Sequence, residues 1–191
     1  MSEMPLTIRW MGPLSFRPDD ATSIFTSPAA ASAGLYLWAI PTPDGYLVQR
    51  VGGTPKPFWL CHYELLEAFR RGAYPIHRAA SLAAGRRDPL YRGQLAGRRD
   101  SAFEVRRRKL EPELNATLAL LAIFLAPLDA GRQLRQRLEA GILRRLESAG
   151  RPYTALLERH RIPAAVTSAT PVQVRSLMEH PVALVEGEYE C

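Results

Sequence analysis

Two short runs of alternating β-forming residues surround a Pro-Asp-Gly turn in the segment GLYLWAIPTPDGYLVQRVGGT, residues 34–54. Runs of this kind around such a turn predict a β-hairpin. Because successive side chains in a strand point to opposite faces, the first strand should divide its apolar residues evenly. One face should carry Tyr36, Trp38 and Ile40, and the other Leu35, Leu37 and Ala39.

The register of the hairpin follows from the length of its turn. If the turn spans Pro41 to Gly45, Ile40 lies opposite Tyr46. Antiparallel pairing then places Tyr36 opposite Arg50, side by side on one face. The sequence therefore predicts an aromatic hydroxyl and a guanidinium group as cross-strand neighbours.

Three further segments have helical patterns. Residues 57–71 begin at a proline and end before Gly72, which suits the two ends of a helix. Two later segments carry one apolar stripe each, as helices packed on a sheet should. The first stripe is Leu114, Leu118, Leu121 and Leu125, ending near Pro127, and the second is Leu134, Leu138, Ile142 and Leu146, ending near Gly150.

The two ends of the chain have weaker patterns. The segment LTIRWMGPLSF predicts an edge strand or an arm over the core, and residues 22–32 form a connector rich in Ser, Ala and Pro. The tail holds a short helical pattern, TALLERHR, and a strand-like run, VALVEG. We expect one domain over 1–191, divided into an arm and connector (1–32), a core (33–150) and a C-terminal extension (151–191).

Composition indicates a globular protein in a reducing compartment. The chain has 191 residues, of which 47% are hydrophobic. This length is enough for one well-buried core and too short for two domains of ordinary size. No apolar run approaches the roughly 20 residues that span a bilayer, and the N-terminus lacks a signal-peptide layout. Two cysteines make neither a disulfide framework nor a zinc pattern. We expect a cytoplasmic protein with no membrane partner.

The positive charge lies in one segment. The formal net charge is +6, and the segment 86–109 holds nine basic and three acidic residues, so the rest of the chain sums to zero. A basic cluster favours an anionic partner such as nucleic acid, although a solvated surface explains it equally well. The 23 arginines against two lysines also fit a GC-rich genome. The candidate nucleic-acid contacts are Arg86, Arg87, Arg98, Arg99, Arg106, Arg107, Arg108 and Lys109.

The hairpin resembles the paired motifs that open a GIY-YIG nuclease domain. The first motif reads Gly34-Leu35-Tyr36, and the second reads Arg50-Val51-Gly52, with arginine in place of tyrosine. This resemblance implies an α/β (α+β) fold with a small central antiparallel or mixed sheet flanked by helices, extended here by C-terminal additions. The likeness covers residues 6–146.

The resemblance also implies a phosphodiester site. Tyr36 matches the first motif tyrosine, and Glu139 matches a glutamate that binds one divalent metal, Mg²⁺ or Mn²⁺. Three positions depart from the family pattern. Arg50 replaces the second tyrosine, Cys61 stands where the helix arginine belongs, and Leu65 stands where a histidine often lies. A thiol does not replace the planar, permanent charge of arginine. We expect Tyr36 and Arg50 to face the same side as Glu139 and the first turns of the helix 57–71.

Each of these residues also has an ordinary structural interpretation. Tyr36 is equally consistent with a packing aromatic, and Glu139 with a surface ion pair to Arg135 one turn earlier. Arg50 either supplies a cation beside Tyr36 or points to solvent. Cys61 is more typical of a small buried apolar residue than of a reactive thiol, and its neighbour His62 points about 100° away along the helix.

The leading hypothesis is a GIY-YIG-like protein that binds nucleic acid, with nuclease activity weakened, altered or lost. The alternative is a scaffold that binds or transforms a small molecule in the former nuclease cleft, using Tyr36, Arg50, Cys61 and Glu139. A third hypothesis is a partner-binding protein without a site. Salt-sensitive DNA binding distinguishes the first hypothesis from the others.

Overall fold

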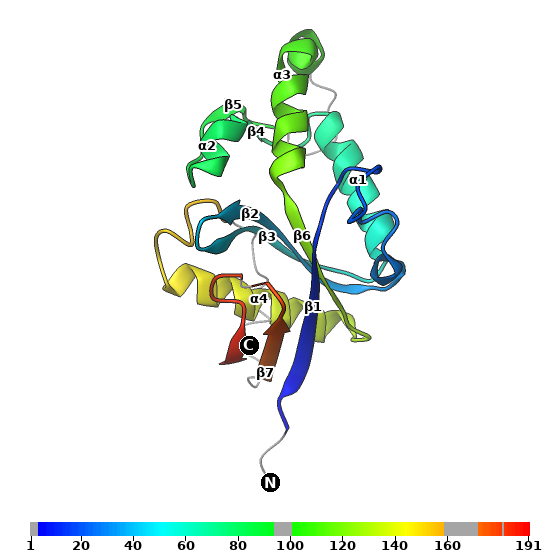
Figure 1. The fold of residues 1–191 in the computed structure, drawn as a ribbon, viewed down its shortest axis with the longest axis vertical. Helices are drawn as coiled ribbons and strands as arrows, with labels where there is room; N and C mark the ends of the chain where they lie inside the picture. The colour runs from blue at the N-terminus through cyan, green and yellow to red at the C-terminus, as the bar shows by residue number, and fades with distance from the viewer. Residues whose placement is uncertain (1–3, 94–100, 159–171, 181) are drawn as a thin grey trace.

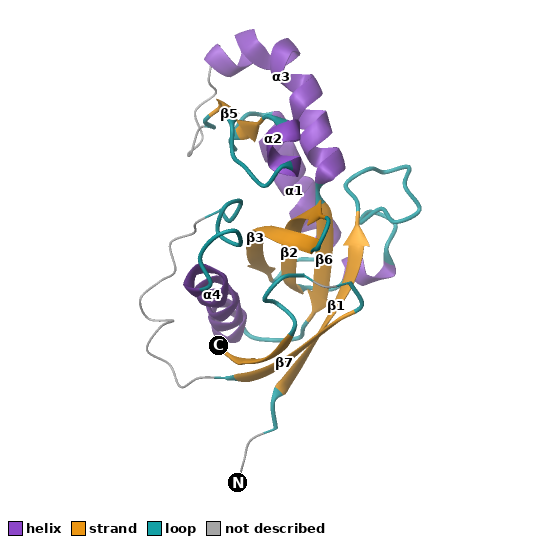
Figure 2. Ribbon diagram, turned by 60° about the vertical axis from the view of Figure 1, so that its left-hand side comes forward, coloured by secondary structure: helices purple, strands orange, loops and turns teal. Residues whose placement is uncertain are grey.

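The computed structural model describes residues 4–93, 101–158, 172–180 and 182–191. Over these residues a six-stranded mixed sheet has helices on both of its faces, and a two-stranded sheet lies at one end (Figures 1 and 2). This is the α+β class that the sequence predicted. The elements are β1 (Leu6–Leu14), η1 (Pro28–Ala31), β2 (Gly34–Thr42), β3 (Gly45–Thr54), α1 (Phe58–Arg70), β4 (Ile76–His77), α2 (Ala79–Ala83), β5 (Pro89–Tyr91), α3 (Ser101–Leu120), β6 (Ala122–Pro127), α4 (Arg132–Ser148), β7 (Gln173–Met178) and β8 (Gly187–Glu190).

The strand order of the main sheet is β3-β2-β6-β1-β7-β8. The β1–β7 pair is parallel and the other pairs are antiparallel.

The apolar stripe that predicted one helix ending near Pro127 is divided between a helix and a strand, so this prediction was wrong over its second half. Leu114 and Leu118 lie on α3, but Leu121 follows its end and Leu125 lies in β6. Because β6 has other strands on both sides and is buried on both faces, its apolar run lacks strand alternation and continues the helical spacing.

The N-terminal strand is not at an edge of the sheet. β1 lies between β6 and β7, and its Trp10 indole N–H donates to the Ser176 hydroxyl of β7 at 2.9 Å. The parallel β1–β7 pairing joins residues about 170 positions apart in sequence, such as Leu6 and Val174. A partner so distant leaves no local pattern in the sequence, so the expectation of an edge strand or arm was wrong.

The predicted hairpin forms, but its register differs from the prediction. Thr42 pairs with Gly45, so the loop holds two residues, and the pairing shifts again between Trp38 and Ala39. As a result Arg50 pairs with Trp38, and Tyr36 pairs with Gly52. Relative to the predicted register, the partner of Tyr36 is displaced by two residues, from Arg50 to Gly52. Since strand side chains alternate with a period of two, Tyr36 and Arg50 still share a face.

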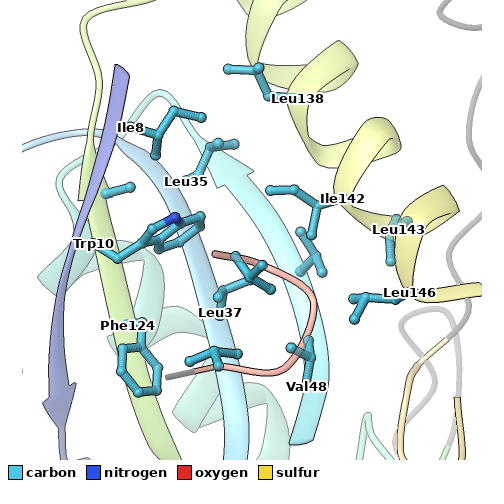
Figure 3. Packing of buried hydrophobic residues seen from close by; sticks show 14 of the residues in the cluster. Ile8, Trp10, Leu35, Leu37, Val48, Phe124, Leu138, Ile142, Leu143 and Leu146 are labelled. Carbon is cyan, nitrogen blue, oxygen red and sulfur yellow. The ribbon is translucent and has the colours of Figure 1, made fainter. Parts of the chain in front are cut away.

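The two faces of the sheet support two separate cores, divided as the hairpin pattern predicted. Leu35 and Leu37 pack with Leu138 and Ile142 of α4 on one face (Figure 3). Tyr36 and Trp38 lie on the other face, among residues of α1 and α3. The hairpin strand β2 is thus covered on both sides, and all seven residues of Gly34–Ile40 are buried.

The helices predicted at residues 57–71 and at the second apolar stripe are confirmed as α1 and α4. The tail patterns were wrong over the described residues. Thr154–Glu158 form turns and an extended segment, with the rest of TALLERHR outside the described residues. Most of VALVEG forms a bridge and turns, and strand β8 begins only at Gly187. Among the described helices, none combines the length and apolar character needed to cross a membrane.

Candidate functional site

The candidate site lies at the outer edge of the described sheet, where β3 is the last strand and carries Gly52 and Gly53. A Cβ atom at Gly52 would lie 2.4 Å from the ring carbon Cζ of Tyr36. The Tyr36 ring therefore crosses β3 through the space that a side chain would fill. A Cβ at Gly53 would point to the opposite face, 3.5 Å from the carboxylate oxygen Oε2 of Glu139.

Tyr36 is held in a closed, aromatic environment. Its side chain lies on β2, only 7% of the residue surface is exposed, and its ring centroid is 4.8 Å from that of His62 in an edge-on contact. Burial, together with the nearby Cys61, raises the pKa of the Tyr36 phenol well above its ordinary value. The phenol is consequently protonated at neutral pH and is a hydrogen-bond donor, not a phenolate base.

Glu139 reaches this edge from the other side of the sheet. Its helix α4 packs on the Leu35 face, opposite the face that carries Tyr36, so the expectation that all the site residues share one side was wrong. The carboxylate accepts a hydrogen bond from the Gly53 backbone N–H, and burial raises its pKa from 4.5 to about 7. The charge of Glu139 also raises the pKa of Tyr36, so the two groups interact across the glycine pair.

Cys61 lies on the first half of α1, half-buried and near Thr54 at the end of β3. Burial raises the pKa of its thiol, although a hydrogen bond with Thr54 opposes the shift. A thiol with a raised pKa is a poor nucleophile at neutral pH. The structure thus brings Cys61 close to Tyr36 but gives it the properties of a packing residue.

Arg50 is buried between two aromatic rings. Its guanidinium carbon lies 4.8 Å from the Trp38 ring centroid and 4.6 Å from the Tyr74 ring centroid. Nη2 is 2.6 Å from Oε2 of Glu158, and Nε donates to the same oxygen at 2.8 Å. The Arg50 side chain is 5% exposed, and burial lowers its pKa while Glu158 raises it, with a net upward shift. Arg50 is therefore a charged residue with its counterion already in place.

Two residues of this region were not predicted as site residues. Glu158 lies in the C-terminal segment, and its own backbone N–H donates to the Gln49 carbonyl at 2.6 Å. A partner 108 positions from Arg50 leaves no local signal in the sequence. His62 is fully buried, shares a 2.8 Å hydrogen bond between Nδ1 and the Phe58 carbonyl, and has a pKa lowered to about 4 by burial. The helical spacing of Phe58, His62, Leu66 and Phe69 could have identified this buried stripe.

Four of the predicted nucleic-acid contacts lie on α3, which reaches one end of the molecule (Figure 1). Arg106, Arg107, Arg108 and Lys109 are all exposed on α3. Arg86 and Arg87 follow α2, and the Arg87 guanidinium donates to the Leu156 carbonyl at 2.5 Å. Arg98 and Arg99 lie outside the described residues.

Comparisons of the chain with protein-family models, curated proteins and solved structures found no match.

The glycine pair gives a matched test of the edge geometry. Gly52→Ala should destabilise the protein by about 1–3 kcal/mol, because its new methyl group overlaps the immobile Tyr36 ring. Gly53→Ala is the control, since its methyl group would meet other atoms at 3.4 Å or more. Urea unfolding measures both. In a Tyr36→Ala background, Gly52→Ala should no longer cost free energy of unfolding through a clash, because the ring is gone. Equal losses of stability for Gly52→Ala and Gly53→Ala in the wild-type background would contradict this geometry.

The raised pKa of Glu139 predicts a pH dependence of stability. Below pH 4.5 the carboxyl is protonated in both states; between 4.5 and about 7 only the folded state keeps the proton, so stability falls as pH rises through this window. His62, with its lowered pKa, acts in the opposite direction. Urea unfolding from about pH 5 to about pH 8 should therefore show Glu139→Gln gaining stability relative to the wild type. A difference in unfolding free energy between Glu139→Gln and the wild type that stays constant across that range would contradict a raised pKa of the Glu139 carboxyl.

Proposed function

We propose that this protein is a GIY-YIG-like, nucleic-acid-binding protein whose phosphodiester cleavage is weakened or lost. The observation that carries the proposal is the row of exposed cations on α3, Arg106 to Lys109. Within it, Arg107 lies 3.8 Å from Glu104, and both side chains are more than half exposed. Exposed ion pairs of this kind are worth little, so the guanidinium is free to exchange this partner for a phosphate.

The sheet edge supports the resemblance only in part, because Tyr36 and Glu139 approach β3 from opposite faces of the sheet. Tyr36, Gly52 and Glu139, which carry the resemblance in sequence, come from three different elements and approach one another at β3. The order of hairpin, helix, strand and helix along β2, β3, α1, β6 and α4 is also compatible with a GIY-YIG-like core. The family assignment rests on these residues alone.

The chemistry of the edge disfavours cleavage. Phosphoryl transfer needs cationic groups directed at the developing negative charge. Cys61, at the position of the family arginine, is an uncharged thiol, and Arg50 is buried against Glu158. No described cation of the predicted catalytic set is thus available to a phosphate at Tyr36.

A metal ion at Glu139 stays a prediction. Among the described residues, no three His, Cys, Asp or Glu side chains gather into a group that could hold a metal. Glu139 would be a single carboxylate that burial keeps partly protonated near neutral pH. Because a metal ligand must be deprotonated, this donor set fits Mg²⁺ or Mn²⁺ poorly, and we derive no step through a metal ion.

The small-molecule alternative receives less support. A ligand in the former cleft would have to reach Tyr36 and Arg50, which are 7% and 4% exposed. Binding sites for small molecules are concave and accessible. A ligand that binds Arg50 would have to displace its partner Glu158, whereas the cations of α3 are accessible as they stand.

Nucleic-acid binding should weaken steeply as salt rises, because phosphate contacts release counterions. Reversal of Arg106, Arg107 and Arg108 to glutamate should reduce the affinity for a duplex by at least about tenfold at low salt. The control reverses Arg9, Arg132 and Arg144, which are exposed on other elements and give the same change in net charge. Fluorescence anisotropy with labelled DNA measures both. Equal loss in the two triple variants would contradict a binding surface on α3.

The same complexes, incubated with Mg²⁺ or Mn²⁺ on plasmid and branched DNA, test the second half of the proposal. We expect little or no cleavage. Robust cleavage that Glu139→Ala abolishes would show that the altered edge is still a working nuclease site. Undetectable binding at low salt would refute the proposed function as a whole.

A further inference from the structure

A groove lies between α1 and α3, away from the edge site. It consists of two cavities of about 400 Å³ and 410 Å³ that share Arg70 and Asn115 in their walls, and so lie side by side. Its apolar lining comes from α1, β4, α3 and the loop after β1. These residues are Phe16, Leu66, Ile76, Phe103, Leu110, Leu114 and Leu118.

Two exposed aromatic residues lie on α1, toward its N-terminal end from the groove residues Leu66 and Arg70. Trp59 is 45% exposed and Tyr63 is 51% exposed, although aromatic side chains of this size are usually covered. Trp59, Tyr63, Leu66 and Arg70 follow the i, i+4, i+7, i+11 spacing, which places them on one stripe of the helix. Since Leu66 and Arg70 line the cavities, the two aromatic rings lie on the same flank of α1.

Arginines border the groove. Arg17, Arg70 and Arg107 line its walls, with Glu111 among them. The acidic partners of the three arginines are 3.9 Å, 3.1 Å and 3.8 Å away, and all six side chains are about a third exposed or more, so these pairs are weak. The adjoining turns of α3 add Arg106, Arg108 and Lys109, so the groove opens beside the most positive segment of the chain.

We propose that this groove binds single-stranded nucleic acid, with bases on Trp59 and Tyr63 and phosphates on Arg70 and Arg107. The inference rests on the proposed nucleic-acid binding and specifies its substrate class. Unpaired bases have free π-faces that stack on aromatic side chains, whereas a duplex presents mainly phosphates to a protein surface. Exposed rings on the same stripe of α1 as Arg70 therefore match a single strand better than a duplex.

Trp59 provides a direct readout, because the other two tryptophans, Trp10 and Trp38, are 4% and 0% exposed. Titration with an oligothymidylate of about 15 nucleotides should quench the Trp59 fluorescence, with the same midpoint that anisotropy of the labelled oligonucleotide gives. Trp59→Ala should weaken binding on the order of tenfold, and Trp59→Phe should keep most of the affinity. Leu177→Ala, an exposed apolar residue on β7, is the matched control and should have no effect.

The outcomes separate this proposal from the proposed function. Salt-sensitive binding with unchanged Trp59 fluorescence, or an equal affinity of Trp59→Ala and the wild type, would overturn the groove but leave nucleic-acid binding on α3. An absence of binding to every oligonucleotide would remove both. Comparison of the affinities for oligothymidylate and for oligouridylate of equal length shows whether the groove prefers DNA or RNA. Self-association that shields Trp59 without nucleic acid would assign the groove to a second copy of the chain and overturn the proposal.

Discussion

The ion pair between Arg50 and Glu158 is the constraint on which the surroundings of the candidate site depend. Arg50 lies between Trp38 and Tyr74, and its guanidinium is bound to the Glu158 carboxylate at 2.6 Å. A buried arginine without a counterion would be strongly destabilising. The pair therefore holds the C-terminal segment against the hairpin and against the segment between α1 and β4. It also removes Arg50 from any reaction with a phosphate.

The proposed binding surface on α3 and the candidate site at the sheet edge are separated in this molecule. At the sheet edge, Tyr36 and Cys61 are uncharged at neutral pH, and Glu139 is partly so, because burial raises the pKa of each group. A run of four exposed cations lies instead on α3, which extends away from the hairpin (Figure 2). A nucleic acid bound along α3 would meet cations that anchor it, whereas the cation predicted for cleavage, Arg50, is held by Glu158. This separation is the physical basis of the proposed function.

Local patterns predicted the local parts of the structure. The alternation in Gly34–Ile40 correctly assigned its two faces. Helix α1 begins and ends within two residues of Pro57 and Gly72, and α4 ends two residues before Gly150. Features set by distant contacts escaped prediction. β6 looked helical because it is buried on both faces, and the register error arose from a two-residue loop and an irregularity at Trp38. The sequence predicted Arg50 as a site residue. No local pattern predicted its partner Glu158, 108 positions away, which determines the role of Arg50.

The most direct test of the central claim, that Arg50 is a structural cation held by Glu158, is a double-mutant cycle in urea unfolding. Glu158→Gln should cost about 3 kcal/mol, because it leaves a buried guanidinium without its counterion. Arg50→Met combined with Glu158→Gln should cost much less than the sum of the single changes, since the charge that needs a partner is gone. A cost for Glu158→Gln below about 0.5 kcal/mol, or additive single changes, would show that Arg50 does not depend on Glu158 and would contradict the account.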